Sequence, residues 1–385
     1  MKTPTKHIIS LAALLAMALT APAASAQTAG AQADSAADRS LLEKTVQWAE
    51  SVLDLLTVEG ERWSVATYPA ASYSGRTGLA VGIMQAWQHS GGRSHRPTTI
   101  APTVLVSTKR MFEIQADADI YPSERISIGG KAEFFYLPDD YYGIGNGSKS
   151  VLTEYTIHKY SLTADVLADV ARCLRVGLTA DICYVDFSGY DAGLASVFDS
   201  GWCNGLGPMV QFDTRDDVVY PTSGWLATAA ATGFWHGLGS RSDFVLAELD
   251  VRRYLDLHRR RVVALQALLH TSAGSAPFWR LPSCGGTRLG RAIPHSLKYV
   301  DRRAWLVQAE YRCPVYWRIG ATAFAAAGNV SHTWAARELT DRVHLMLGGG
   351  LRFNVLPGRN LNMRLDAGIS SRGDHAFYLN IREAF

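Results

Sequence analysis

The chain has 385 residues, a formal net charge of +3 at pH 7 and 19% charged residues. This near-neutral balance excludes the strongly basic surface that nucleic-acid binding requires. The five cysteines are spaced too widely for a zinc motif and are too few for a dense disulfide framework, so we expect neither.

Residues 1–26 have the features of a cleaved export signal. Lys2 and Lys6 precede the apolar stretch ISLAALLAMAL, and Ala24-Ser25-Ala26 forms a cleavage site. The apolar stretch is shorter than the ~20 residues that a membrane anchor needs, and no later stretch is long enough for a transmembrane helix. Removal of the signal leaves 36 basic residues, 38 less the two lysines, against 35 acidic ones.

Residues 27–61 are predicted to form a flexible segment with one short amphipathic helix. Residues 27–39 are rich in Ala, Gln and Ser. In residues 40–57, Ser40 is a candidate N-cap, and apolar side chains recur at helical spacing at Leu42, Val46, Leu53 and Leu56. Four placements are open for such a helix: packed on the domain that follows, on the membrane surface, inside a pore, or bound to a partner.

From residue 62 to residue 385 the hydrophobic period is two, which is typical of strands. In FEIQADADIY (112–121) every second residue is apolar, and those between them, as far as Asp119, are acidic or amide. The alternation recurs in LRVGLTADICY (174–184), FVLAELDVRRYL (244–255), LNMRLDAGIS (361–370) and HAFYLNIREAF (375–385). About sixteen such strands can be drawn, separated by turn signals such as YPSER (121–125) and LPGRN (356–360).

Two architectures fit this alternation, a soluble sandwich or set of β domains and a membrane barrel. The apolar faces carry almost no charge, and a charge facing lipid at mid-membrane costs ~2–4 kcal/mol. A closed barrel also leaves no unpaired strand edge in lipid. We therefore predict an all-β membrane protein, a monomeric antiparallel barrel of about 16 strands in the bacterial outer membrane. Its lumen would be mixed in charge, with Glu113, Asp117, Asp119, Asp181, Glu248 and Asp250 against Arg175, Arg252, Arg312, Arg352, Arg364 and Arg382.

Four stretches, in one order along the chain, carry a family resemblance. They are FFYLPDDYYGIGNGS (134–148), FDTRDDVVYPTSGW (212–225), LPSCGGTRLGRA (281–292) with LVQAEYRCPV (306–315), and LGGGLRFNV (347–355) through FYLNIREAF (377–385). Together they resemble the bacterial surface antigen family, the BamA/TamA-like outer-membrane proteins. The family barrel has sixteen strands, which agrees with the count from alternation.

The resemblance implies that the longest connection, residues 275–299, is the sixth extracellular loop and folds back into the lumen. In the family a loop arginine then docks on acidic residues of the wall. In this chain the resemblance implies that Arg288 or Arg291, beside Gly290, pairs with the inward-facing Glu310 and holds the loop on the wall. This ion pair is called the lock.

The other motif residues are predicted to have structural roles. The motif turn consists of Asp213, Arg215, Asp216, Pro221 and Gly224. Its charged side chains are predicted to pair locally, and its proline and glycine to reverse the chain on the periplasmic side. The motif loop, whose glycines let the backbone approach a neighbour, consists of Tyr142, Gly143 and Gly145. Phe385 falls on the apolar face of the last strand and is predicted to be the C-terminal barrel signal.

The chain departs from the family pattern in three places. Ala292 stands where an aromatic residue follows the loop glycine, Ala326 stands where a wall strand carries an acid, and residues 27–61 are too short for a periplasmic polypeptide-transport-associated repeat.

Two functions stay open: assembly or transport of protein or lipid, helped by an envelope protein bound at residues 40–57, and a passive or structural barrel. The first predicts a weak seam between the first strand (63–74) and the last (376–385).

The sequence predicts no catalytic, metal or cofactor site. No Gly-x-Ser-x-Gly motif and no pair of histidines at zinc-protease spacing occurs. The expected partners are outer-membrane lipids. Because export is oxidising and Cys203 and Cys284 both fall near the extracellular end, a disulfide between them is a further prediction.

Overall fold

The computed structural model describes residues 57–60, 62–89, 98–147, 150–286, 289–356, 361–381 and 383–385. The predicted export signal and residues 40–56 of the predicted helix lie outside these ranges. The last residue of that prediction, Thr57, opens a short strand, β1 (Thr57–Glu59), instead of closing a helix. The chain divides into two compact units, Met1–Val58 and Glu59–Phe385.

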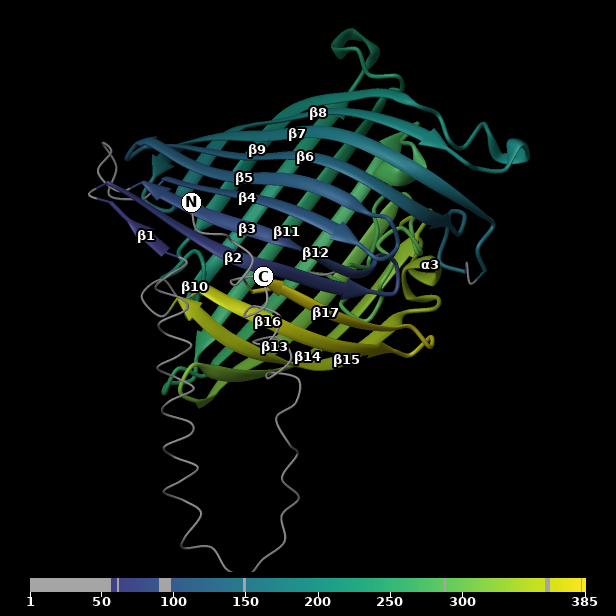
Figure 1. Ribbon diagram of the computed structural model, residues 1–385. Coiled ribbons are helices and arrows are strands. Elements are labelled where there is room, and N and C mark those ends of the chain that lie inside the picture. Colours follow the sequence, from purple (N-terminus) through teal and green to yellow (C-terminus); the bar gives the residue numbers. More distant parts are fainter. Residues whose placement is uncertain are drawn as a thin grey trace, which may run out of the picture. The chain divides into compact units, whose positions relative to one another are not determined.

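The second unit is a closed antiparallel barrel (Figure 1). Each strand from β2 to β17 pairs with the next along the chain, and β17 lies beside β2. The strands are β2 (Trp63–Ser74), β3 (Gly78–His89), β4 (Thr98–Ser107), β5 (Phe112–Ser123), β6 (Ile126–Tyr141), β7 (Thr153–Ala171), β8 (Leu174–Ser188), β9 (Gly201–Asp213), β10 (Gly224–Phe234), β11 (Phe244–Asp256), β12 (Val262–Gly274), β13 (Arg303–Tyr316), β14 (Ile319–Ser331), β15 (His344–Leu356), β16 (Leu361–Ser370) and β17 (His375–Ile381). Short helical turns occur at η1 (Ala192–Leu194), η2 (His236–Leu238), η3 (Phe278–Arg280) and α3 (Ala336–Thr340). The predicted count of about sixteen barrel strands is confirmed.

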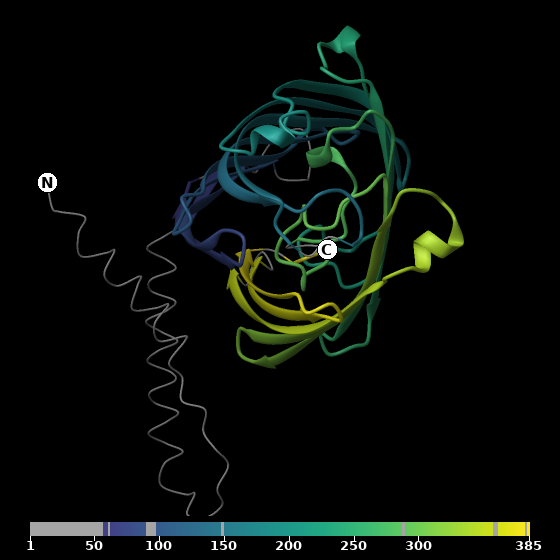
Figure 2. The ribbon, with the colours of Figure 1, turned by 90° about the vertical axis from the view of Figure 1, so that its right-hand side faces the viewer.

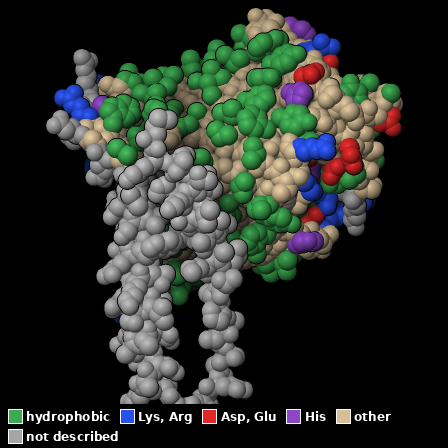
Figure 3. All heavy atoms as spheres, viewed as in Figure 1, with side chains coloured by type: hydrophobic (Ala, Val, Ile, Leu, Met, Phe, Trp, Pro, Cys, Tyr) green, Lys and Arg blue, Asp and Glu red, His purple; other side chains and the backbone are tan. Residues whose placement is uncertain are grey.

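The two faces of the wall differ as the alternation predicts. Outward-facing Leu178 and Ile369 are 54% and 65% exposed, whereas inward-facing Glu310 and Asp366 are 1% and 0% exposed. In the space-filling view apolar side chains cover the outer wall, and charged ones gather toward the ends (Figure 3). In the described part of the chain no helix is long and apolar enough to span a membrane.

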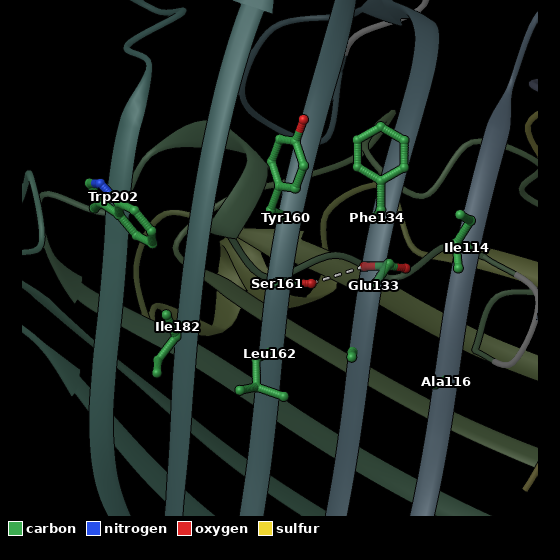
Figure 4. Close-up of a pocket in the computed structure, with 10 residues that line it drawn as sticks. Ile114, Ala116, Glu133, Phe134, Tyr160, Ser161, Leu162, Ile182 and Trp202 are labelled. Carbon is green, nitrogen blue, oxygen red and sulfur yellow. Dashed lines mark hydrogen bonds between the residues drawn. The ribbon is translucent and has the colours of Figure 1, made fainter. Parts of the chain in front are cut away.

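An aromatic row runs across the outer face of β5 to β9. Neighbouring ring centroids lie 4.9 to 6.4 Å apart along Phe112, Phe134, Tyr160, Tyr184 and Trp202. Beside it, Ile114, Leu162 and Ile182 line a shallow apolar groove of about 430 Å³ (Figure 4). An aromatic band bordering an aliphatic surface is the pattern that membrane barrels present at the lipid interface.

The barrel has two unlike ends. One, the loop end, carries the long connections 142–152, 189–200, 235–243, 275–302 and 332–343. The other, the turn end, carries the short turns 124–125, 172–173, 257–261 and 317–318, the motif turn, the start of β2 and the end of the chain. Strand length is also uneven at the closure, because β17 has 7 residues against 12 in β2, so the seam pairs over a shorter stretch than the β2–β3 hairpin does.

Phe385 does not lie on the apolar face of the last strand, so the predicted placement was wrong, while its role as the C-terminal barrel signal stays a prediction. Strand β17 ends at Ile381, and beyond it the alternation no longer decides where a side chain points. Phe385 is 6% exposed and packs inside the barrel with Tyr254 and Ala264. Arg312 donates from Nη2 to the Phe385 carbonyl oxygen at 2.7 Å, and Figure 2 shows the C-terminus within the ring of strands.

Candidate functional site

The connection between β12 and β13, residues 275–302, folds into the lumen (Figure 2). Its residues Cys284, Ala292 and Ile293 are each 0% exposed. They pack against wall side chains of β12 to β15, namely Leu268, Ala304, Leu306, Val330 and Met346. The segment therefore forms an internal layer of the barrel, here called the lumen loop.

The lumen loop is folded on itself by small residues. The Ile293 amide donates to the Gly290 carbonyl at 2.8 Å, and the Gly286 amide donates to the Ile293 carbonyl at 3.2 Å. A Cβ at Gly290 would lie 2.0 Å from the Cys284 carbonyl oxygen, so only glycine allows this approach. Thr287 and Arg288 lie outside the described residues, so the predicted alternative lock at Arg288 stays a prediction.

Arg291 reaches two wall carboxylates. Its Nη1 lies 2.5 Å from Glu310 Oε2 on β13 and 3.0 Å from Asp366 Oδ2 on β16, and all three side chains are fully buried. The guanidinium also lies over the Phe324 ring, 3.7 Å from its centroid. The structure thus brings the predicted residues Arg291 and Glu310 together and adds Asp366, which the sequence analysis did not single out.

The pair belongs to a larger lumen charge cluster. Arg352 lies 2.6 Å from Asp366 and 2.7 Å from Glu383, Arg312 lies 2.7 Å from Glu310, and Arg364 lies 2.7 Å from Asp366. Charge-assisted pairs of this kind are strong where water is excluded, provided that every carboxylate keeps a partner. The cluster connects the lumen loop to the wall and, through Glu383, to the C-terminal segment.

The two local departures from the family pattern lie in this region. Ala292 is fully buried and packs against Gly368, where an added Cβ would come within 3.2 Å of the Ala292 Cα. Ala326 is partly buried against the apolar side of the lumen loop. Glu310 and Asp366 supply the wall acids to Arg291, so the lock does not use an acid at position 326.

A second anchor lies nearer the loop end. His295 Nε2 bonds to Asp139 on β6, and Arg76, in the turn between β2 and β3, bonds to the same carboxylate and donates to Ser296 Oγ at 3.2 Å. Tyr155 also donates to Asp139 at 3.2 Å. Burial lowers the pKa of His295 although Asp139 opposes the shift, so the ring is neutral at neutral pH. His295 and Ser296 have different partners and do not form a nucleophile–base pair.

A third set of contacts joins the lumen loop to the last strand. Lys298 Nζ lies 2.5 Å from Asp374, and the Tyr299 hydroxyl donates to the same carboxylate at 3.1 Å. Tyr378 on β17 donates to the Ile293 carbonyl at 3.0 Å. Because Arg76 follows β2 and Asp374 precedes β17, the loop contacts both sides of the seam.

The motif loop closes over the lumen loop. The Gly145 amide donates to the Val300 carbonyl at 2.7 Å, and the Tyr142 ring meets the His295 ring edge to face at 5.0 Å. Gly143 and Gly145 have φ angles of +85° and +116°, which glycine adopts without strain. The adjacent Asn146 donates to the Asp341 and Arg342 carbonyls across the barrel mouth. This segment and the lumen loop therefore pack together.

The motif turn lies at the opposite end of the barrel. Arg215 pairs with Asp213 at 2.9 Å, while Asp216 accepts the amides of Thr222 and Ser223 at 2.9 and 3.1 Å. Burial by itself would raise the pKa of Asp216, but these hydrogen bonds outweigh it, so the pKa is lowered. Pro221 is buried beside the reversal. The structure does not bring the motif turn to the lumen loop.

Gly224→Ala is expected to destabilise the barrel by about 1–3 kcal/mol, because Gly224 has a φ of +103° and a Cβ there would lie 2.2 Å from the Thr214 carbonyl oxygen. Urea unfolding of the protein in lipid vesicles measures the loss. Gly373→Ala is the matched control, since Gly373 has a φ of +87° but no atom within 4 Å of an added Cβ. Equal losses at the two positions would contradict the steric explanation.

Cys203 and Cys284, predicted as a disulfide, are both free and lie in different clusters. Cys203 faces the lumen from β9 among aromatic side chains, whereas Cys284 lies in the lumen loop against β12 to β15. The prediction was wrong because both positions are near the loop end but on different parts of the wall.

Comparisons with known proteins agree with this architecture. The family model of the Omp85 superfamily domain matches residues 121–377. Among solved structures, BamA from Haemophilus ducreyi lacking POTRA domains 1–3 is 13% identical, with a TM-score of 0.57 over 84% of this chain and 70% of that chain. CdiB from Acinetobacter baumannii is 9% identical, with a TM-score of 0.53 over 84% of this chain and 60% of that chain. No curated protein sequence gave a significant match. The family match covers well over half of the chain, and the barrel has the same fold as those of BamA and CdiB, so this chain belongs to the Omp85 superfamily.

Proposed function

We propose that this protein assembles or transports protein or lipid at the bacterial outer membrane, and that the lumen loop closes the barrel at rest. The observation that carries the proposal is the attachment of one loop to three parts of the wall. Arg291 contacts the wall at Glu310 and Asp366, His295 contacts Asp139, and Lys298 contacts Asp374. A passive pore has no need of so many polar contacts between one loop and its wall.

The contacts at the seam support a gating role. The loop meets the turn after β2 through Arg76 and Ser296, and it meets β17 through Ile293 and Tyr378. Release of the loop would therefore remove bonds from both edges of the β2–β17 seam. In this proposal an incoming client or lipid gains access through the β2–β17 seam, outer-membrane lipids surround the wall, and the monomeric barrel performs no catalytic step.

The test is client insertion by a barrel whose seam can be locked. Tyr73 on β2 and Phe377 on β17 face outward with ring centroids 6.2 Å apart, so Tyr73→Cys with Phe377→Cys, in a background free of native cysteines, provides an oxidisable seam lock. The readout is the rate at which a urea-unfolded small barrel protein folds into phosphatidylethanolamine/phosphatidylglycerol vesicles. We expect acceleration by the unlocked protein and loss of that acceleration on oxidation.

A matched control locks a hairpin instead of the seam. Ala71 on β2 lies directly opposite Val81 on β3, so Ala71→Cys with Val81→Cys restrains the same strand and leaves the seam free. This variant is expected to retain its activity after oxidation. If vesicles with the unlocked protein fold the client no faster than empty vesicles, the assembly proposal fails.

The alternative is a passive or structural barrel. The observation that favours it is that two of the predicted lumen acids, Asp119 and Glu248, remain accessible to water. A steady conductance of the natural protein, without client folding, would support this alternative. An envelope protein bound at residues 40–57 stays a proposal, and cross-linking from that segment tests it.

A further inference from the structure

Cys183 and Cys203 lie directly opposite each other on neighbouring strands. The β8–β9 register runs without a shift from Leu174 opposite Phe212 to Val185 opposite Gly201, and it pairs Cys183 with Cys203. Opposed residues in an antiparallel pair point to the same side of the sheet. Both thiols are buried, at 0% and 3% exposure, whereas the preceding residues Ile182 and Trp202 are exposed on the outer wall. The two thiols therefore face each other in the lumen.

The type of pairing sets the distance between them. The Asp213 amide donates to the Cys173 carbonyl at 2.9 Å, which makes that pair a hydrogen-bonded one. In an antiparallel ladder such pairs recur at every second residue, and Cys183 follows Cys173 by ten residues in an unbroken register. Hydrogen-bonded pairs have Cα atoms ~5.5 Å apart, within the ~4.4–6.8 Å that a disulfide spans. Their Cβ atoms lie at the wider end of the ~4.5–5.5 Å range, because the non-hydrogen-bonded pairs are the closer ones, so closing the bond needs an approach of roughly 1–2 Å.

The surroundings favour a disulfide over other uses of two thiols. Both belong to an apolar cluster with Phe234, Phe244 and Phe278. No group of three or more His, Cys, Asp or Glu side chains among the described residues could hold a metal ion there or elsewhere. The remaining cysteines are on other elements: Cys173 in the turn after β7, Cys284 in the lumen loop and Cys313 on β13.

We propose that Cys183 and Cys203 form a cross-strand disulfide when the protein is oxidised, and that this is a covalent modification site of the barrel. One thiolate attacks a disulfide oxidant, either a disulfide-carrying protein or oxidised glutathione, and forms a mixed disulfide while one carrier thiol leaves. The second thiolate displaces the other carrier thiol. In total, two protein thiols and one carrier disulfide become one protein disulfide and two carrier thiols, and two electrons pass to the carrier.

The site lies beneath the first part of the lumen loop. Arg280, in η3, makes a two-pronged contact with Asp181 at 2.7 and 2.8 Å, and Asp181 precedes Cys183 by two residues on the same face of β8. Oxidation therefore occurs before the loop docks during export, or when this part of the loop moves away. The bond would hold β8 and β9 together where they receive Arg280. This inference does not depend on the proposed transport function.

The test is a thiol count on the full chain. Protein folded in vesicles is treated with oxidised glutathione in the presence and absence of low urea, denatured in N-ethylmaleimide, reduced, and alkylated with iodoacetamide for mass spectrometry. Of the five cysteines, all free in this structure, we expect three to carry the first label and two, Cys183 and Cys203, to carry the second. Protein taken directly from cell envelopes is expected to give the same division.

Three variants make the count specific. Cys183→Ser and Cys203→Ser should each leave four thiols that take the first label only, whereas Cys284→Ser should still show two that need reduction. Five first-label thiols in the natural protein, with and without urea, would overturn the proposal. A second-label pair that includes Cys284 would overturn it as well.

Discussion

Arg291→Ala is expected to release the lumen loop and to raise the single-channel conductance in planar bilayers from small and flickering to large and steady. The variant removes the Arg291 contacts at 2.5 Å to Glu310 and 3.0 Å to Asp366. Removal of one partner from a buried pair typically costs ~3–5 kcal/mol. Here the cost should be near the lower limit, because Arg312, Arg352 and Arg364 still neutralise the two carboxylates.

Cys284 provides an independent readout of the same release. It is 0% exposed in the docked loop, and burial raises the pKa of its thiol to about 12. The thiolate is the reactive form, so alkylation at pH 8 should be slow in a protein in which Cys284 is the only cysteine. Arg291→Ala in that background is expected to increase the labelling rate by at least about 100-fold, the equivalent of ~3 kcal/mol.

The control is Arg241→Ala. Arg241 also forms an ion pair at the loop end, with Asp199 at 2.6 Å, but its side chain is 61% exposed, and solvent screens such surface pairs so that they add little to stability. This variant should leave both the conductance and the labelling rate unchanged. An Arg291→Ala protein with natural conductance and a protected Cys284 would show that the charge cluster does not hold the loop.

Gly290→Ala is the second large effect and tests shape without changing charge. The added Cβ would lie 2.0 Å from the Cys284 carbonyl oxygen and 3.2 Å from Gly285 Cα, so the loop cannot keep its fold while Arg291 reaches the wall. Forcing extra volume into a packed site costs ~1–3 kcal/mol or more. We expect the same increases in conductance and Cys284 labelling as in Arg291→Ala.

Gly130→Ala is the matched control for this variant. Gly130 is a wall glycine on β6 at which an added Cβ has only an ordinary contact, 3.6 Å from the Thr163 carbonyl oxygen. It should behave as the natural protein does. If Gly290→Ala opens the lumen and Arg291→Ala does not, the loop is retained by its packing and the ion pairs only orient it.

Alternation along the chain was sufficient to predict the barrel, because the two sides of a membrane wall meet different solvents. In FEIQADADIY a period of two already separates the lipid face from the lumen face, and the same alternation recurs in LNMRLDAGIS, the stretch that contains Asp366. Arg291 and Glu310 came from a family resemblance, and the structure brings these two side chains together.

The two-residue alternation of a strand predicts whether a side chain faces the lumen or the lipid. It does not predict which other lumen-facing residue that side chain contacts. Closure of the barrel decided that Arg291 meets Asp366, 75 residues away, and that His295 meets Asp139, 156 residues away. The alternation also fails where a strand ends, so Phe385 turns into the lumen. Cys183 lies opposite Cys203 because hydrogen bonds between β8 and β9 set their register, whereas Cys284, the partner predicted for Cys203, lies in the lumen loop.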